Sequence, residues 1–398
     1  MQPDHFNFLL IRYGEIGLKS TKVRRRLENL LSNRILQMLD RKKIQYEKLK
    51  LFPTRGRLFI YTQQLNNAIE ELKKCFGIVS LSPAFQIATD REEIQEAALK
   101  MAEMSLDTNQ SFAIKTTRVG QHPFSSQDIS VQVGAYILTN LSDRQIKVNL
   151  TNPDHTIYIE IRDKETYLFN QIIYGTGGLP YGSQGKAVSL ISGGIDSPIA
   201  SWLMMKRGCK IFPIFADLAP YTTSAAEDRL IQVLQRLFAY TPYKQITFYR
   251  FPHGIYLQQV KDFIPPKLTC IFCKRMMYRV AEKLALSLNA KGIVTGENLG
   301  QVASQTLDNL YVLNQAVKLP VFRPLIGFDK NETIELSKKL DIYASSIVQV
   351  PSCTAVPKYP ETHGSLEDIL KIEQEHDFDR ISTEQFEKIE KIKIPFSI

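Results

Sequence analysis

Six residues between an apolar run and a helical pattern restrict the fold of this chain more than any other feature. Residues 192–197 read SGGIDS, the apolar run AVSLI ends at residue 191, and Pro198 opens the helical pattern. Glycines let backbone amides approach an anion, and the N-terminus of the following helix adds the favourable end of its dipole. Pro198 suits a first helical turn, where its missing N–H costs nothing. The segment therefore predicts a phosphate-binding loop at the end of a buried strand.

Short apolar runs alternate with helical patterns on both sides of this loop. The runs are 187–191, 210–216, 245–251 and 292–296, and the helical patterns between them are 198–208, 227–240 and 276–290. This alternation is typical of a doubly wound parallel sheet, which binds ligands at the carboxyl ends of its strands. The fold class predicted for this part of the chain is therefore α/β.

Two further blocks precede the alternating part. Residues 1–65 and 66–175 each mix strand-like and helical patterns, which is typical of small α+β domains. A glycine-rich stretch, 174–186, then indicates a linker. We expect three domains, with bounds 1–65, 66–175 and 176–398.

Positive charge is concentrated in the first block. Residues 1–60 hold fourteen lysines and arginines and five carboxylates, which accounts for the whole net charge of +9. A nucleic acid favours such a concentration because neutralised phosphates release counterions. A solvated helix face gives the same pattern. Lys19, Lys22 and Arg24, Arg25 and Arg26, on or beside the first helical pattern, are the candidate nucleic-acid contacts.

Composition also excludes some classes of protein. The chain is 44% hydrophobic, enough to build cores, yet no apolar run approaches the roughly 18 residues that a membrane span needs. The first residues lack the pattern of a secretory signal, and five cysteines in 398 residues do not suggest a disulfide framework. We expect a cytoplasmic protein with no membrane partner.

The loop and several other segments resemble known families. No lysine follows the second glycine, so the loop differs from G-x-x-x-x-G-K-[ST] and resembles the SGGxDS loop of PP-loop ATP pyrophosphatases. Those enzymes cleave ATP between the α- and β-phosphates and pass AMP to an oxygen. Further segments are similar to the 4-thiouridine synthetase (ThiI) family: GGLPYG at 177–182, CKRMMYR at 273–279, VTGENLGQVASQT at 294–306 and LPVFRPLIGFDK at 319–330. The first block resembles the ferredoxin-like domain of this family, and CFGIVSLSP at 75–83 resembles part of a THUMP RNA-binding domain.

The resemblance, which covers nearly the whole chain, implies a reaction in two stages. ATP adenylates O4 of the uridine at position eight of tRNA, and sulfur then displaces AMP to give 4-thiouridine. Asp196 would hold Mg²⁺ or orient the loop, and Arg275 would offset charge on the phosphates. The residues that the resemblance places around ATP are Leu190, Ile191, Ser192, Gly193, Gly194, Ile195, Asp196, Ser197, Phe215, Ala216, Arg275, Gly296 and Gln305.

Three cysteines are candidates for sulfur chemistry. Cys353 aligns with the sulfur-handling cysteine, and Cys270 and Cys273 form a C-x-x-C before a helix. A zinc site lacks a well-spaced fourth ligand, since His363 is a weak candidate, and a redox dithiol at the C-x-x-C is a second interpretation. The third is an iron–sulfur cluster bound by all three cysteines, with an open iron that holds exogenous sulfide. Similarity to archaeal-type members without a rhodanese domain favours the cluster.

The resemblance also implies partners and leaves alternatives open. Lys115 and Arg118 match a basic strand and loop that face RNA, the resemblance implies a homodimer, and inorganic sulfide is the candidate sulfur donor. One alternative is a PP-loop pyrophosphatase that acts on a small molecule, which would have no use for a basic N-terminal block. Another is an RNA-binding protein with a decayed nucleotide fold, against which the intact Asp196 and Arg275 argue.

Overall fold

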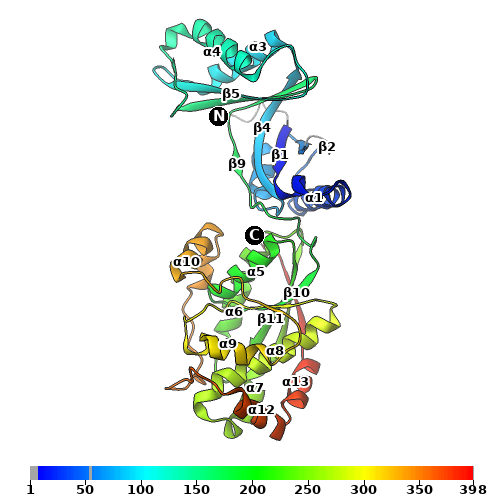
Figure 1. Ribbon diagram of the computed structural model, residues 1–398, viewed down its shortest axis with the longest axis vertical. Coiled ribbons are helices and arrows are strands. Elements are labelled where there is room, and N and C mark those ends of the chain that lie inside the picture. Colours follow the sequence, from blue (N-terminus) through cyan, green and yellow to red (C-terminus); the bar gives the residue numbers. More distant parts are fainter. Residues whose placement is uncertain (1–7, 53–55, 398) are drawn as a thin grey trace. The chain divides into compact units, whose positions relative to one another are not determined.

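The structure is a computed structural model that describes residues 8–52 and 56–397. The chain divides into two compact units, Met1–Gly178 and Leu179–Ile398, which we call the N-terminal and C-terminal units and describe separately (Figure 1). The division lies within the glycine-rich stretch, where Gly177 and Gly178 have φ of 65° and 77°. Because side chains make such angles costly, glycine suits both positions.

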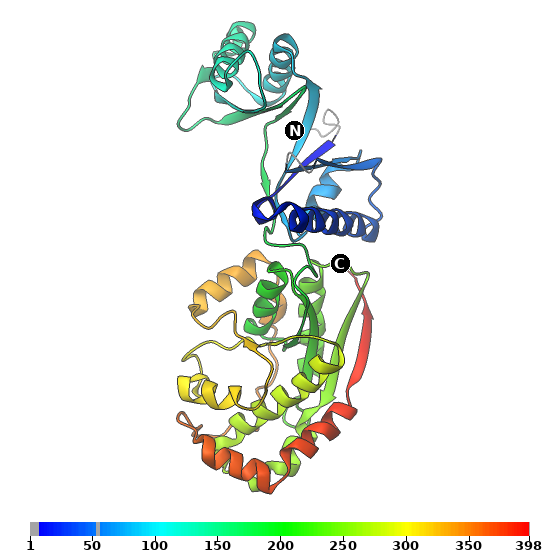
Figure 2. The same ribbon diagram turned by 45° about the vertical axis from the view of Figure 1, so that its right-hand side comes forward.

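A six-stranded sheet forms the centre of the C-terminal unit, in the order β14-β13-β10-β11-β12-β15. The strands are β10 (Lys186–Leu190), β11 (Lys210–Asp217), β12 (Gln245–Pro252), β13 (Ile293–Val294), β14 (Val321–Phe322) and β15 (Glu390–Pro395). Neighbouring strands are parallel except for β15, which pairs antiparallel with β12 at the edge of the sheet (Figure 2). The predicted doubly wound parallel sheet is confirmed, and the antiparallel edge strand is a feature that the sequence analysis did not include.

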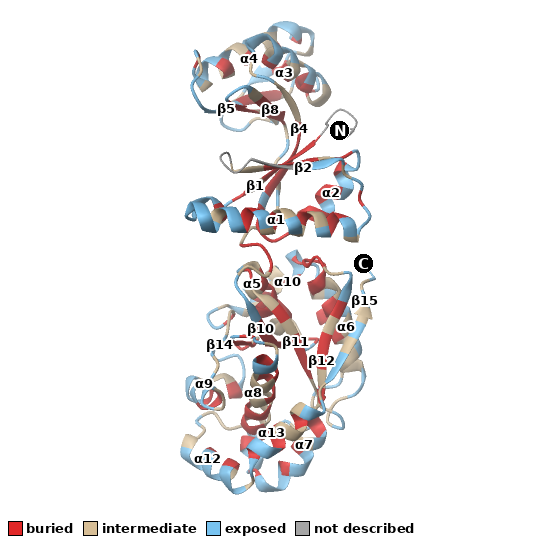
Figure 3. Cartoon of the chain, turned by 90° about the vertical axis from the view of Figure 1, so that its right-hand side faces the viewer, coloured by how far each residue is buried: buried red, intermediate tan, exposed pale blue. Residues whose placement is uncertain are grey.

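Helices cover both faces of this sheet. They are α5 (Asp196–Lys206), α6 (Ala225–Phe238), α7 (His253–Val260), α8 (Thr269–Ser287), α9 (Leu307–Asn314), α10 (Lys330–Lys339), α11 (Tyr343–Ser346), α12 (Leu366–Glu375) and α13 (Phe378–Glu387). On β10, Val188 packs into a cluster with Val280 and Leu284 of α8. The next residue, Ser189, points to the opposite face and hydrogen-bonds Ser201 of α5 at 2.8 Å. Both faces are therefore buried, and Figure 3 shows buried residues along β10, β11 and α8.

The N-terminal unit is built on a second sheet, in the order β2-β3-β1-β4-β8-β7-β5-β6, with β9 paired to β4. Its strands are β1 (Phe8–Tyr13), β2 (Lys48–Phe52), β3 (Arg57–Tyr61), β4 (Ile78–Ala88), β5 (Ser111–Val119), β6 (Lys147–Val148), β7 (His155–Arg162), β8 (Glu165–Phe169) and β9 (Ile173–Tyr174). Its helices are α1 (Thr21–Arg41), α2 (Leu65–Leu72), α3 (Arg91–Ser105) and α4 (Ser126–Asn140).

The long strand β4 joins the two halves of this sheet. Its first part pairs with β1, with Ala84 opposite Phe8, and its last part pairs with β8, with Phe85 opposite Leu168. Both α+β patterns therefore contribute to one continuous sheet, and the domain boundary expected between residues 65 and 66 stays a prediction. Among the described residues, no helix is both long and apolar enough to cross a lipid bilayer.

Candidate nucleotide and sulfur-transfer site

The strand order of the C-terminal unit places a crevice beside the SGGIDS loop. The chain runs from β10 outward through β11 and β12, and β13 then pairs on the other side of β10. Ligands bind at such a reversal, outside the carboxyl ends of the strands. A cavity of about 530 Å³ lies there. Those residues of the predicted ATP site that line it are Leu190, Ile191, Ser192, Gly193, Gly194, Asp196, Ser197, Phe215, Ala216 and Gly296.

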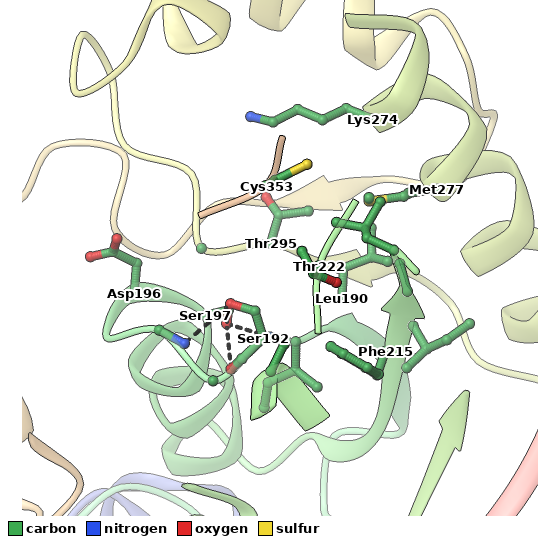
Figure 4. Close-up of a pocket in the computed structure, with 18 of the residues that line it drawn as sticks. Leu190, Ser192, Asp196, Ser197, Phe215, Thr222, Lys274, Met277, Thr295 and Cys353 are labelled. Carbon is green, nitrogen blue, oxygen red and sulfur yellow. Dashed lines mark hydrogen bonds between the residues drawn. The ribbon is translucent and has the colours of Figure 1, made fainter. Parts of the chain in front are cut away.

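Hydrogen bonds within the loop fix its shape (Figure 4). The Ser192 amide donates to Ser197 Oγ at 2.9 Å, and the two serine hydroxyls lie 3.2 Å apart. The Gly194 amide lies 3.4 Å from Ser192 Oγ. The loop turns directly into α5, whose N-terminus favours negative charge. The conformation of the loop is therefore set by hydrogen bonds among its own residues.

Gly296 allows the segment after β13 to approach the loop. A methyl group on this residue would lie 2.5 Å from the backbone nitrogen of Ser197, which is closer than non-bonded atoms approach. Any larger residue would push the two strand ends apart. Glycine at 296 is thus a geometric requirement of the crevice.

Asp196 is held by side chains that the sequence analysis did not single out. Lys330 Nζ lies 2.7 Å and 2.9 Å from its two carboxylate oxygens, and Gln301 Nε2 donates to Oδ2 at 3.2 Å. Lys330 is the first residue of α10, and both partners belong to segments that carry the family resemblance. Asp196 is therefore oriented beside the loop by a partly exposed ion pair.

The structure does not support the direct ATP contact predicted for Arg275. This side chain is 0% exposed, and its guanidinium binds both oxygens of Glu373 at 2.7 Å and 2.6 Å. Arg279 binds the same two oxygens at 2.7 Å and 2.6 Å. Arg275 is therefore part of a buried network that ties α8 to α12. Ile195 and Gln305 do not line the cavity either.

Lys274, the residue before Arg275, lines the cavity instead. Its ammonium lies 3.1 Å from Glu297 Oε1, and Arg323 Nε lies 2.8 Å from Glu297 Oε2. Burial acts to raise the pKa of Glu297, but the cations of Lys274 and Arg323 outweigh it and keep the pKa below its ordinary value. Figure 4 shows Lys274 and Cys353 on the side of the pocket away from Ser192 and Ser197.

We expect Glu373→Ala to lower the free energy of unfolding of the protein by about 3–5 kcal/mol, because the buried guanidinium of Arg275 loses its counter-charge. Denaturant unfolding measures this change. Asp379→Ala is a matched control, because Asp379 contacts Arg279 at 3.7 Å from a side chain that is 85% exposed. This control should lower the free energy of unfolding by less than about 1 kcal/mol. Equal stability of the two variants would contradict the role given to the buried network.

The three candidate cysteines differ in their position relative to the cavity. Cys353 lines the cavity, whereas Cys270 and Cys273 are half-buried in the first turns of α8. Burial raises the pKa of Cys273, and the thiols of Cys270 and Cys353 add to the rise. Lys274, which follows Cys273 on α8, lines the same cavity as Cys353, so the start of α8 and the Cys353 segment lie near one cavity wall. Within residues 8–52 and 56–397, however, no group of three His, Cys, Asp or Glu side chains is arranged to hold a metal ion.

A buried histidine lies within hydrogen-bond distance of Cys273. His253 Nε2 lies 3.3 Å from Cys273 Sγ, and His253 Nδ1 lies 2.8 Å from Gln385 Oε1. Burial lowers the pKa of His253 to about 4, so the ring is neutral at pH 7. His363, the weak zinc candidate, is exposed and paired with Asp308 at 2.6 Å. The histidine beside the C-x-x-C is therefore one that the sequence analysis did not consider.

The candidate RNA contacts of the N-terminal unit fall into two groups. Lys19, Lys22, Arg25 and Arg26 are exposed. Arg24 instead holds the buried Glu28 at 2.8 Å and the Tyr13 hydroxyl at 3.2 Å, which is a structural role.

In the other half of the sheet, the exposed Lys115 lines a second cavity, of about 690 Å³, between β5 and α4. The exposed Arg118 lies near the end of β5.

Comparisons with known proteins agree with this architecture. The family model described as thiamine biosynthesis protein (ThiI) matches residues 182–378, a THUMP domain matches 88–170 and the ThiI ferredoxin-like domain matches 8–82. The probable tRNA sulfurtransferase of Methanobrevibacter smithii is 39% identical over 368 residues, covering 91% of this chain and 94% of the relative. That of Methanothermobacter thermautotrophicus is 37% identical over 395 residues, covering 98% of each.

A solved structure also resembles the chain over nearly its full length. A crystal structure described as a 4-thiouridine synthetase–RNA complex with bound ATP is 31% identical, with a TM-score of 0.85, and the match covers 98% of this chain and 100% of that one. The matched domains follow the same order as the α+β and α/β parts described above. The chain belongs to the ThiI family.

Proposed function

We propose that this chain is an ATP-dependent tRNA sulfurtransferase that adenylates O4 of the uridine at position eight and then exchanges that oxygen for sulfur. The observation that carries the proposal is that the phosphate loop and Cys353 line one cavity. A single site can therefore activate a carbonyl oxygen with ATP and present sulfur to the neighbouring carbon. The similar 4-thiouridine synthetase was solved with RNA and ATP, which supports both substrates.

In the first step, uridine O4 attacks the α-phosphorus of ATP, and the bond to the β-phosphate breaks to release pyrophosphate. The loop amides and the N-terminus of α5 would hold the phosphates, and Lys274 would offset their charge. In the second step, sulfur at the oxidation level of sulfide attacks C4, and AMP leaves with the original oxygen. The substitution therefore needs no reductant. Cys353, on the cavity wall, would orient the sulfide toward C4.

Mg²⁺ fits this site through Asp196 and the phosphates of ATP. Hard oxygen ligands suit this ion, which would neutralise phosphate charge when bound. Because Lys330 already bridges both oxygens of Asp196, the ion would share this carboxylate with the ammonium group or displace it.

Thiolation of defined tRNA tests the proposed function. The purified protein, supplied anaerobically with ATP, sulfide and unmodified tRNA, should form 4-thiouridine that mass spectrometry maps to position eight. A tRNA with cytidine at this position is the matched control and should neither gain sulfur nor stimulate release of pyrophosphate. Equal pyrophosphate release with both tRNAs would contradict the proposed substrate.

We also propose that Cys270, Cys273 and Cys353 hold an iron–sulfur cluster. Three thiols are a donor set that such clusters use, and Lys274, which follows Cys273 in the chain, lines the same cavity as Cys353, which supports the fit. The sulfurs would have to draw closer, since the described residues form no ready metal site. The cluster would supply an open iron for sulfide. Anaerobic iron and sulfide analysis of each Cys→Ser variant tests the ligand set.

The exposed cations of α1 should contribute to tRNA affinity without sequence preference. We expect Arg25→Glu/Arg26→Glu to weaken tRNA binding in low salt and to reduce the slope of log K against log salt by about one for each phosphate that is no longer neutralised. Arg34→Glu, on the same helix, is a control for non-specific charge effects, since Arg34 Nη1 binds Gln37 at 2.7 Å. Unchanged affinity and slope in the double variant would show that this face of α1 does not contact tRNA.

A further inference from the structure

The wall of the nucleotide cavity carries a second cation, Arg229, in the first turns of α6. The other lysine or arginine of the lining, Lys274, is paired with Glu297. Arg229, in contrast, has no carboxylate within ion-pair distance in the part of the chain that the structure describes. Burial lowers the pKa of its guanidinium, and no anion offsets that effect. A cation in this setting gains free energy from an anionic ligand.

Arg229 lies directly against the phosphate loop. A methyl group on Gly193 would come within 2.8 Å of Arg229 Nε and 2.9 Å of its Cγ, so this glycine leaves room for the arginine side chain. Arg229 Nε is buried and has no hydrogen-bond partner among the described atoms. The guanidinium thus has unused donor capacity at the loop that is built for phosphate.

The same side chain also holds the segment that leads to Cys353. Arg229 Nη1 donates to the carbonyl oxygen of Val348 at 3.1 Å. Beyond the cysteine, the amide of Thr354 donates to the carbonyl oxygen of Tyr221 at 3.0 Å. The segment that carries Cys353 is therefore attached on both sides, by a backbone bond to Tyr221 before α6 and by Arg229 within α6.

We propose that Arg229 binds the polyphosphate of ATP and, through Val348, positions the Cys353 segment over the phosphate loop. A guanidinium has five N–H donors, so the bond to Val348 leaves others for phosphate oxygens. One side chain thereby links the group that activates the tRNA to the group that handles sulfur. This inference rests on the proposed function, because it requires ATP in this cavity.

Three variants test the proposal by two independent measurements. Arg229→Met removes the cation, Arg229→Lys keeps the charge without the planar set of donors, and Arg236→Met is the control on the same helix, since Arg236 is paired with Asp341 away from the cavity. The first measurement is the dissociation constant of ATP with Mg²⁺. The second is the alkylation rate of Cys353 relative to Cys209 without nucleotide, mapped by mass spectrometry.

We expect Arg229→Met to weaken ATP binding by about tenfold or more, as the loss of a charge-assisted hydrogen bond predicts. Arg229→Lys should lose less affinity. Both variants should alkylate Cys353 faster than the unchanged protein does, because one attachment of the segment is gone, and Arg236→Met should match the unchanged protein in both measurements. Unchanged affinity in Arg229→Met, or unchanged alkylation in both Arg229 variants, would overturn the proposal.

These outcomes are distinct from failure of the proposed function. If the unchanged protein neither binds ATP nor thiolates tRNA, the proposed function fails and the role of Arg229 fails with it. If the unchanged protein does both and Arg229→Met behaves identically, only the role of Arg229 is lost. Equal denaturant midpoints of the four proteins would show that the effects arise in the cavity.

Discussion

Replacement of Asp196 by alanine should lower the rate of ATP-dependent tRNA adenylation by about 10²–10³-fold, the usual cost of removing one preorganised electrostatic group from a site of charge transfer. The carboxylate lies at the start of α5 and is held by Lys330 and Gln301. Without it, the ammonium of Lys330 loses its partner and is free to move onto the phosphates in an unproductive position. Release of pyrophosphate in the presence of tRNA measures the effect.

Two comparisons make the result specific. Asp196→Asn preserves the size of the side chain but removes its charge, so a similar loss would show that the charge matters. Asp262→Ala changes an exposed carboxylate outside the cavity and should leave the rate unchanged. Since the candidate RNA contacts lie in the other unit, tRNA affinity should stay near that of the unchanged protein. A near-normal rate for Asp196→Ala would refute the assignment.

Replacement of Cys353 by serine should abolish formation of 4-thiouridine while adenylation of tRNA persists. Serine keeps the size of the side chain but supplies no thiolate to bind iron or to act as a nucleophile. Cys353 lines the cavity opposite the phosphate loop, so its loss should leave the ATP contacts in place. Mass spectrometry of the tRNA and release of pyrophosphate separate the two stages.

Variants of the other cysteines distinguish a cluster mechanism from one that uses Cys353 alone. If a cluster operates, Cys270→Ser and Cys273→Ser should also stop thiolation and lose bound iron, while Cys209→Ser, away from the cavity, should do neither. If both C-x-x-C variants make thiouridine normally, the cluster fails and Cys353 acts alone as a nucleophile. Normal thiolation by Cys353→Ser would exclude this residue from sulfur transfer altogether.

Local sequence was enough to predict the phosphate loop and the sheet that presents it. The loop, the strand before it and the helix after it are consecutive in the chain, so the sequence alone shows their pattern. The antiparallel pairing of β15 with β12 was not predictable in this way, because it joins residues 140 to 150 positions apart, from Arg250 with Glu390 to Gln245 with Pro395, whose pairing depends on the completed sheet. The continuity of β4 between β1 and β8 is hidden for the same reason.

In the candidate site, too, local sequence predicts some features, while others depend on distant contacts. The rule that ligands bind at the ends of parallel strands predicts that Leu190, Phe215 and Gly296 line the cavity, as they do. The roles of Lys330 and Arg229 depend on contacts across 134 and 119 positions of the chain, which no local pattern contains. The burial of Arg275 likewise depends on Glu373, 98 positions away, which is why the sequence analysis placed this arginine at ATP instead.

The two faces of α8 have a consequence for length changes in this helix. Cys270, Cys273, Lys274, Met277 and Tyr278 recur at intervals of three and four residues; the last three line the cavity, while Arg275 and Arg279, four apart, bind Glu373. Each residue turns the helix by about 100°, so a change of length within 270–279 rotates the residues after it relative to those before it. A one-residue deletion between Cys270 and Lys274 would bring Arg275 to the cavity position of Lys274 and Met276 to the buried position of Arg275, so that stability and chemistry would be lost together. Tolerance to substitution and tolerance to change of length should therefore differ sharply along this helix.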